Sequence, residues 1–434
     1  MKLTSGTKTI INALNAHGYE GYAVGGFVRN VLLNIPVSDV DVTTSATPDE
    51  MLEVFKDFKV YKTGLKHGTL TVSACGENIE VTTYRIDGGY QDGRHPDSVT
   101  FVTSLEEDLK RRDFTVNAMA TSGDEVIDLY GGQDDLKNKL IRAVGNPDVR
   151  FQEDALRILR ALRFASVLGF EIEEQTAISI ERNKHLLKNV SVERIFQELN
   201  KLLLGKGVEN VLLKYSSVIF EIIPELKACS GFLQNSVYHA YDVYTHTAKS
   251  VAYSSGDRIV RWALLLHDIE KPSTYTQDEK GGHFYTHQAK GAETSIKVLK
   301  RLKADNKLIT TCYDLIKLHD IKTEITRPEM KKLLCKYGYE TIDLLCKVKL
   351  GDALSHAEPY ATLRKETVER FSALATSVEK SGECYTLKML NVNGNDLKAR
   401  GYKGENIKEK LNFLLNEVIF ERVKNQKEEL LKLI

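Results

Sequence analysis

The residues best suited to chemistry early in the chain are two carboxylates, Asp39 and Asp41, separated by one valine. Apolar and acidic residues alternate from Asp39 to Val42 with the period of a half-buried strand, so both carboxylates are expected on one face. Carboxylate oxygens suit Mg²⁺. Two such ions about 4 Å apart can clamp the attacking and leaving oxygens of a phosphoryl transfer. The pair therefore predicts metal-assisted phosphoryl transfer, with ordinary surface charge as the alternative.

A glycine pair precedes these carboxylates. Gly25 and Gly26 end an apolar run, and residues 27–33 are expected to begin a helix. Backbone N–H groups at such a helix start can face a triphosphate. Arg29 lies one turn into this helix and would add positive charge.

The elements that must position these groups form a small α+β head. Glu80 lies in an alternating segment and is a candidate third acidic ligand, with a solvent-facing strand residue as the alternative. The glycine-rich polar loop at 86–98 is expected to be mobile. A helix is expected at 7–17, and short strands are expected at 22–24, 40–42, 58–61, 69–74, 79–84 and 99–101.

A dense charged cluster at 108–118 follows the loop, with its charges placed where a helix is expected to begin. Such a cluster is usually a solvated face. Here Phe114, Val116 and Ala118 alternate directly behind the charges and would anchor them on a core. Anchored charge suits ribose and phosphate contacts.

Helical spacing then places Asp154, Arg157 and Arg160 on one side of a helix predicted over 153–164. An Asp and an Arg one turn apart can read Watson-Crick edges, one as acceptor and one as donor. The alternative is an i,i+3 salt bridge on an ordinary helix. Residues 174–223 continue as amphipathic helices, with Arg194, Glu198 and Lys201 on one exposed stripe.

Histidines concentrate between residues 239 and 356. Several of them, with aspartates, have the composition of a metal-dependent hydrolase site built from helices: His246, His267, Asp268, His287, His319 and Asp352. Single histidines would be core or surface residues, but His267-Asp268 follows an apolar run and is expected to be buried. Further on, residues 407–419 form an amphipathic helical stripe whose basic side could meet an RNA backbone.

Composition limits the remaining possibilities. The 434 residues carry equal numbers of basic and acidic side chains, so RNA binding must come from local patches. The six cysteines show no metal-ligand or disulfide-like spacing, which is typical of reduced thiols. The N-terminus lacks a signal-peptide pattern, and no run of eighteen apolar residues occurs. A soluble cytoplasmic protein without a membrane partner is expected.

The order of the motifs resembles a class II CCA-adding tRNA nucleotidyltransferase of the bacterial type, with a polymerase-beta-like head. The resemblance rests on GGFVRN with DVDV, RRDFTVNA, EDALRILRALRF and RIFQELNKLLLG, and spans residues 20–434. It implies an α+β fold, in which a small mixed-sheet head precedes an all-α body with an HD-like domain. The implied parts are a head or palm at 1–140, a base-recognising helical neck at 141–230, an HD-like domain at 231–370 and a tRNA-binding tail at 371–434.

The resemblance also implies roles for individual residues. Asp39 and Asp41 would be catalytic and hold Mg²⁺, and Asp154 with Arg157 would select CTP or ATP without a nucleic-acid template. The partners would be the tRNA 3′ end, CTP and ATP, and no DNA is expected. The loop at 86–98 lies where the family carries a loop tied to the switch from C to A addition, which favours full CCA addition. The nucleotide-binding residues would be Gly25, Gly26, Arg29, Arg112, Asp113, Asn117, Asp154, Arg157, Arg160 and Arg163.

Residues 239–352 resemble an HD phosphohydrolase domain, which implies a second divalent metal held by His246, His267, Asp268 and Asp352. The chain departs from the family at two positions. Asn30 replaces the usual Asp after Arg29, which keeps a hydrogen-bond acceptor but loses a charge, so weaker organisation is expected. Glu270 replaces a Gly and is expected to crowd or alter the HD metal site.

Three rival functions remain open from the sequence. A bacterial poly(A) polymerase shares the head but adds only A. An HD phosphohydrolase acting on RNA ends or nucleotides would use the head only for binding. A tRNA-binding module with a decayed site would be expected to lose Asp39, Asp41, Arg112 and Asp113, and all four are present.

Overall fold

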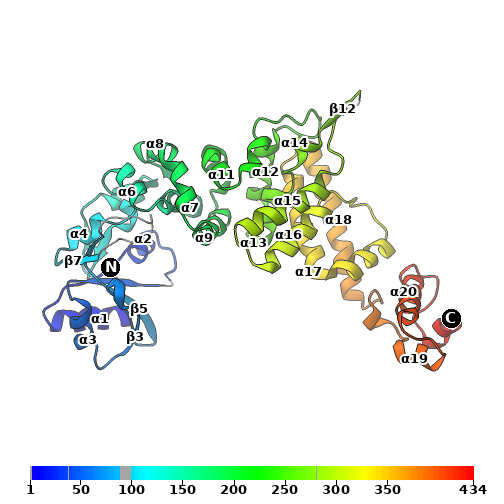
Figure 1. The fold of residues 1–434 in the computed structure, drawn as a ribbon, viewed down its shortest axis with the longest axis horizontal. Helices are drawn as coiled ribbons and strands as arrows, with labels where there is room; N and C mark the ends of the chain where they lie inside the picture. The colour runs from blue at the N-terminus through cyan, green and yellow to red at the C-terminus, as the bar shows by residue number, and fades with distance from the viewer. Residues whose placement is uncertain (1, 38, 88–98, 280) are drawn as a thin grey trace. The chain divides into compact units, whose positions relative to one another are not determined.

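The computed structural model describes residues 2–37, 39–87, 99–279 and 281–434, and it divides into two compact units, Met1–Pro224 and Glu225–Ile434 (Figure 1). The loop predicted to be mobile lies, from residue 88 to 98, outside the described residues. Among the helices that are described, none combines the length and the apolar character needed to cross a bilayer.

Unit 1 is built on a mixed sheet, which has seven strands in the described residues and the order β3-β4-β5-β2-β1-β8-β9. Neighbours are antiparallel except β2 and β5, which run parallel with Asp41 opposite Glu80. The strands are β1 (Gly21–Val24), β2 (Asp41–Thr44), β3 (Lys59–Gly64), β4 (Thr69–Ala74), β5 (Glu77–Thr83), β8 (Met119–Thr121) and β9 (Val126–Asp128).

Alternation along these strands explains how the sheet is covered. Leu70 and Val72 on β4 are fully buried against α1 (Ser5–Ala16) and α3 (Pro48–Val54), which supply Ile10 and Met51 to the same core. A capping box and Pro48 begin α3. The alternating apolar positions therefore attach one face of the sheet to two helices, as period-two burial requires.

Two of the six predicted strands have the observed bounds, and the other four are shifted by one to three residues at one or both ends. β4 has the predicted bounds, whereas β2 begins at Asp41, so Asp39 lies just before the strand. β7 (Val99–Phe101) also has the predicted bounds but pairs with β6 (Arg85–Asp87) in a separate ribbon. The three-residue strands β8 and β9 were not predicted, because so short a segment carries little periodic signal.

The rest of unit 1 is mostly helical. The helix predicted over 153–164 is in fact two helices, because Asp154 has an extended backbone between α6 (Pro147–Glu153) and α7 (Leu156–Leu168). A short parallel pair, β10 (Leu140–Ile141) and β11 (Glu171–Ile172), lies nearby. The other helices are α2 (Gly26–Leu32), α4 (Leu105–Lys110), α5 (Gly132–Lys137), α8 (Glu174–Asn183), α9 (Val192–Leu203), α10 (Val208–Lys214) and α11 (Ser216–Ile222), with 3-10 turns at Leu65–His67, Thr115–Asn117, Lys184–Asn189 and Pro224–Cys229.

Unit 2 is helical apart from one two-stranded ribbon, β12 (Thr276–Asp278) with β13 (Gly281–His283). The fold class is therefore the predicted one, α+β with a mixed-sheet head and a helical body. The helices are α12 (Val243–Tyr253), α13 (Arg258–Leu266), α14 (Lys271–Thr274), α15 (His287–Arg301), α16 (Asn306–Leu318), α17 (Arg327–Leu354), α18 (Tyr360–Ser381), α19 (Gly394–Ala399), α20 (Glu405–Ile419) and α21 (Lys427–Leu431), with a 3-10 turn at Leu387–Met389.

Helix α13 packs into the core of unit 2, because its apolar residues Trp262 to Leu266 are all buried. Helices α17 and α18 pack side by side (Figure 1). The expected boundary at 370/371 lies within α18, and the residues beyond this helix form their own apolar core from Cys384 to Leu430. The amphipathic stripe predicted at 407–419 packs into this core along α20.

Candidate active site and metal centre

The acidic edge of unit 1 brings together the carboxylates singled out from the sequence. Val40 and Val42 are 7% and 1% exposed, while Asp39 and Asp41 are exposed, which is the alternation expected of a half-buried strand. Burial, together with the nearby charge of Asp39, raises the pKa of Asp41 against the opposing effect of Arg112. Burial, then Asp41 and Asp39, raises the pKa of Glu80. Three mutually repelling carboxylates fit the binding of a divalent cation, which would relieve that repulsion.

Gly25 permits a close approach of an arginine to this edge. It has a φ of +67°, and an added Cβ would lie 3.2 Å from Nη1 of Arg112. A side chain here would both strain the backbone and displace that guanidinium. The glycine therefore brings the start of α2 close to Arg112.

Arg29 on α2 is held by two amide oxygens. Oδ1 of Asn30 accepts from Nε and Nη2 of Arg29 at 3.1 and 2.9 Å, and Oδ1 of Asn117 accepts from Nη1. Burial is the main reason that the pKa of Arg29 falls to about 10, with Arg163 and Arg160 adding to the effect. Asn30 thus retains the acceptor geometry even though its side chain carries no charge.

Asp108 is an organising residue that the sequence did not single out. Its side chain is fully buried and pairs with Nη2 of Arg111 at 2.6 Å and with Nη2 of Arg112 at 3.0 Å. Burial alone would raise its pKa, but Arg112 and Arg111 hold the pKa below its usual range. An ionised carboxylate under two guanidiniums orients both of them toward the cavity. The sequence did contain a signal for this role, because Asp108 precedes Arg111 and Arg112 by one helical turn, the spacing at which helix side chains can pair.

Asp113 anchors Arg160 rather than facing the cavity freely. Oδ2 of Asp113 accepts from Nε and Nη2 of Arg160 at 2.8 and 2.6 Å, while Oδ1 accepts from Asn117 at 3.0 Å. Burial opposes ionisation, yet Arg160 and Asn117 lower the pKa of Asp113 to about 2. The predicted helix at this point is only one 3-10 turn, Thr115–Asn117, after the preceding helix α4.

Asp154 and Arg157 do not form the i,i+3 pair that was the alternative interpretation. Because the helix breaks at Asp154, this carboxylate turns toward α9 and accepts from Arg194 at 2.7 Å. Arg157 instead pairs with Glu153 at 2.6 Å and donates to the carbonyl oxygen of Arg111 at 3.0 Å. The two side chains therefore sit in the same cavity with separate supports.

Of the stripe predicted to be exposed on α9, Lys201 is exposed, whereas Arg194 and Glu198 are turned toward this site. Glu198 is 7% exposed and lies 2.7 Å from Nε of Arg163. Arg163 also lies with its guanidinium 4.0 Å from the ring centroid of Phe164, a cation–π contact. The cause is that Glu198 finds a partner on α7 and Arg194 finds one in the α6–α7 break. Arg194 was therefore missed as a site residue.

Many of these groups line one cavity of about 420 Å³, whose described lining includes Asp41 but neither Asp39 nor Glu80. Its described lining holds more arginines than aspartates, and Gly25, Gly26 and Asn117 complete one wall. Such a surplus of fixed guanidiniums beside a carboxylate edge suits a polyanion that carries its own divalent cation. The charged lining residues are Arg29, Arg111, Arg112, Arg157, Arg160, Arg163, Arg194, Asp41, Asp113 and Asp154.

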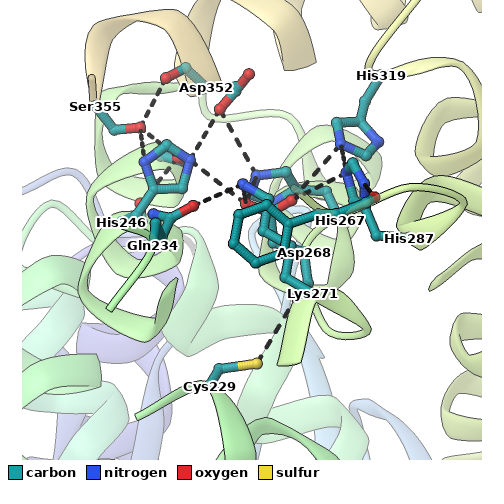
Figure 2. Close-up of polar contacts among 12 residues, drawn as sticks. Cys229, Gln234, His246, His267, Asp268, Lys271, His287, His319, Asp352 and Ser355 are labelled. Atoms are coloured by element: carbon teal, nitrogen blue, oxygen red, sulfur yellow. Dashed lines mark hydrogen bonds and ion pairs between the residues drawn. The ribbon is translucent and has the colours of Figure 1, made fainter. Parts of the chain in front are cut away.

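Unit 2 brings together the four residues that the HD resemblance implied (Figure 2). Nε2 of His246 lies 2.9 Å from Oδ1 of Asp352, and Nε2 of His267 lies 3.1 Å from Oδ2 of Asp268. His246 comes from α12, Asp352 from α17, and His267-Asp268 follow the end of α13. Burial would raise the pKa of Asp268, but His267 and Lys271 hold it well below its usual range. A buried ionised carboxylate among imidazoles is a suitable donor set for a transition-metal dication.

Glu270 does not crowd this centre. Its Oε1 accepts from Oγ1 of Thr294 at 2.6 Å, and its Oε2 accepts from Ser273. The backbone φ at Glu270 is −101°, which any residue adopts, so the position does not need glycine. The carboxylate is thus engaged by α14 and α15 rather than by the histidines, and an altered metal site remains a prediction.

Comparisons with protein-family models cover most of the chain. Residues 21–142 match the poly A polymerase head domain. Residues 169–229 match the probable RNA and SrmB-binding site of polymerase A, and residues 278–434 match the putative tRNA nucleotidyltransferase domain 2.

Curated relatives and solved structures agree with these matches. The chain is 36% identical to the CCA-adding enzyme of Geobacillus kaustophilus over 427 residues, which is 96% of this chain and 93% of the relative. It is 50% identical to those of Limosilactobacillus fermentum and Enterococcus faecalis, but these alignments span only 51% and 62% of the relatives' length. The Bacillus stearothermophilus CCA-adding enzyme in complex with CTP aligns with 100% of the chain and 98% of its own, at 32% identity and a TM-score of 0.73.

Proposed function

The chain belongs to the family of CCA-adding enzymes, and on that premise we propose that it adds the terminal CCA to tRNA from CTP and ATP without a nucleic-acid template. The observation that carries the proposal is the single cavity in which the carboxylate Asp41, the Asp113–Arg160 pair, and Asp154 with Arg157 meet. One cavity thus offers groups for metal, triphosphate and base. Its substrates, a tRNA and free nucleotides, would place the protein in the cytoplasm.

The proposed reaction is in-line attack by the tRNA 3′-hydroxyl on the α-phosphate, with release of pyrophosphate. Asp39 and Asp41 would hold Mg²⁺, with Glu80 as a neighbouring carboxylate. A cation held by these carboxylates would neutralise charge on the reacting phosphate oxygens. The guanidiniums of Arg29, Arg112 and Arg160 would bind the triphosphate, and most of the catalytic effect would come from positioning and charge stabilisation.

Base selection is proposed to rest on Asp154 and Arg157. Asp154 offers acceptor oxygens to an exocyclic amine, which cytosine and adenine both carry, and Arg157 offers donors to a ring or carbonyl acceptor. The supports of the two residues differ, since Asp154 is held by Arg194 and Arg157 by Glu153. Replacing both residues should therefore relax the choice among nucleotides more than it weakens tRNA binding.

A stepwise extension assay tests the proposal. A tRNA lacking its 3′ end is supplied first with CTP alone and then with ATP. A CCA-adding enzyme adds the C residues and stops, and then adds a single A. A run of A without prior C would instead identify a poly(A) polymerase and overturn the proposal.

Unit 2 is proposed to hold a divalent cation of its own with His246, His267, Asp268 and Asp352. The support is the chemistry of the donors, two imidazoles and two carboxylates at the contact distances described above. Loss of bound metal in His267→Ala with CCA addition intact would show that the two sites act separately.

A further inference from the structure

One aromatic ring lies in the wall of the arginine-lined cavity. Phe164, on α7, is 7% exposed and lines that cavity. The guanidinium carbons of Arg163, Arg29 and Arg160 lie 4.0, 5.0 and 5.5 Å from the centroid of this ring. All three distances fall within the roughly 6 Å at which the face of a ring attracts a cation. A single phenylalanine thus contacts three of the cations of the site.

The ring is held by the core, and its cations come from two helices. Phe114 is fully buried and meets Phe164 edge to face, with ring centroids 5.8 Å apart and an interplanar angle of 80°. Arg160 lies one helical turn before Phe164 on α7, and Arg163 directly precedes it, whereas Arg29 comes from α2. The ring is therefore the point at which a cation of α2 meets two cations of α7.

Two of the three guanidiniums are paired with a carboxylate. Nη2 of Arg160 lies 2.6 Å from Oδ2 of Asp113, and Nε of Arg163 lies 2.7 Å from Oε2 of Glu198. The two carboxylates are 9% and 7% exposed. Each pair is therefore neutral as a whole, and the carboxylate fixes the direction of its guanidinium.

Arg29 is the third cation, and its described acceptors are neutral. The amide oxygens of Asn30 and Asn117 accept hydrogen bonds from its guanidinium. The pKa of Arg29 falls to about 10, chiefly through burial and then through repulsion by the two neighbouring guanidiniums. The negative face of the Phe164 ring offsets part of this repulsion.

We propose that Phe164 is a positioning residue for the triphosphate, because its ring face holds Arg29 beside Arg160 and Arg163 so that all three can bind phosphate oxygens together. A guanidinium can rest its flat face on a ring while its N–H donors, which lie in its plane, stay available. Without the ring, the like charges would separate, and the anion would have to bring them together again at a cost in affinity. The role rests on the proposed function, because it takes the bound anion to be a nucleotide triphosphate.

An electrostatic role of this ring can be separated from a packing role. Leucine at position 164 would keep an apolar side chain but would have no ring face. Fluorine atoms on the ring withdraw electron density from its face and weaken its attraction for a cation, while the ring keeps nearly the same shape. A loss that grows with the number of fluorines therefore reports electrostatics rather than packing.

The test measures the binding of inorganic tripolyphosphate to the full chain by isothermal titration calorimetry. Phe164 is replaced, through stop-codon suppression, by phenylalanines that carry one, two or three ring fluorines. We expect Kd to rise stepwise, to about tenfold with three fluorines and by a similar factor in Phe164→Leu. A Kd that does not depend on the number of fluorines, or a parent chain that does not bind tripolyphosphate, would overturn the proposal.

The same fluorine series at Phe55 is the matched control. This ring is also buried, and it meets Phe58 edge to face with centroids 5.7 Å apart in the core beneath the sheet. Fluorination of Phe55 should leave Kd for tripolyphosphate unchanged, and thermal melting of both series reports how far each substitution disturbs packing. An equal rise of Kd in the two series would attribute the effect to packing and overturn the proposal.

A second variant tests whether Arg29 is the cation that depends most on the ring. Asn30→Asp gives Arg29 a charged acceptor in place of a neutral one. In this background we expect three fluorines on Phe164 to raise Kd only about threefold, against about tenfold in the parent chain. Equal factors in the two backgrounds would mean that the ring does not act through Arg29 and would overturn that assignment.

Nucleotide addition distinguishes the role of Phe164 from the function on which it rests. Tripolyphosphate binds without tRNA, so a graded Kd in a chain that performs no CCA addition would remove only the proposed function. In a chain that adds CCA, KM for CTP should rise about tenfold across the fluorine series at Phe164, while kcat changes much less. CCA addition with a KM for CTP that is independent of fluorine number would remove only the role of Phe164.

Discussion

The two sites of this protein concentrate charge in opposite ways. In unit 1, buried carboxylates such as Asp108 and Asp113 pair with arginines that line the cavity. In unit 2, imidazoles such as His267 and His319 have backbone carbonyls behind them and turn their Nε2 atoms toward a central carboxylate. The first arrangement suits an anion and the second suits cations.

The comparison shows how the same residue types serve opposite ligands. Aspartate in unit 1 is mostly a support, since Asp113 and Asp154 are occupied by Arg160 and Arg194. Aspartate in unit 2 is itself the candidate ligand, because Asp268 lies among histidines on both of its oxygens, with Lys271 2.7 Å from Oδ2. The ligand of each site therefore depends on which groups already have partners. Four substitutions test this contrast.

Asp41→Asn should have the largest effect, because Asp41 is the exposed carboxylate at the edge of the arginine-lined cavity. We expect nucleotide addition to fall about a thousandfold, the scale of losing a group that stabilises transition-state charge. Binding of tRNA should remain nearly unchanged in a filter-binding assay. Asp49→Asn, at an exposed position on α3, is the control. Normal addition by Asp41→Asn at saturating Mg²⁺ would remove Asp41 from the site.

Arg194→Ala should have the next largest effect, because it leaves Asp154 without its ion-pair partner. We expect the preference for CTP and ATP over UTP and GTP to fall about tenfold, which corresponds to about 1.4 kcal/mol. Single-nucleotide incorporation kinetics measure it. Arg182→Ala breaks an exposed pair with Asp148 and should change nothing. Equal preferences in Arg194→Ala and the parent chain would mean that Asp154 needs no such support.

Asn30→Asp should have a smaller effect in the favourable direction. It replaces the neutral acceptor of Arg29 by a charged one, and charge-assisted hydrogen bonds are stronger. We expect kcat/KM for CTP to rise about threefold. Asn30→Ala, which removes the acceptor, should lower it. A loss of activity in Asn30→Asp would show that a neutral side chain at position 30 is required in this cavity.

Glu270→Gly should have the smallest effect. Its carboxylate is bound by Thr294 and Ser273 rather than by the histidines. We expect the Mn²⁺ affinity of unit 2 to change far less than the roughly 10–100-fold that loss of an outer-shell partner costs. Competition with a chelator measures it. A large gain in affinity would mean that Glu270 does disturb the centre, as the sequence alone had suggested.

Some of the site could be predicted because its signal is local. Alternation around Asp39 and Asp41 is visible within four residues, and these residues follow the predicted pattern of burial. The break at Asp154 could not be predicted, because Glu153 to Phe164 reads as one continuous amphipathic helix. Glu198 illustrates the same limit. The helical pattern of its own segment predicts an exposed side chain, whereas in the structure Arg163 of another helix lies against it and it is buried.

The sequence by itself determined the fold class, the family and the residue types available at each site, because periodicity and motif order are properties of neighbours along the chain. Only the tertiary structure decided which charges are already paired. It turned Asp154 toward Arg194, directed Glu270 away from the histidines, and placed His287 and His319 on the free oxygen of Asp268. These partners are far apart in sequence, and the energy of a charge depends on what lies within a few ångströms of it in space.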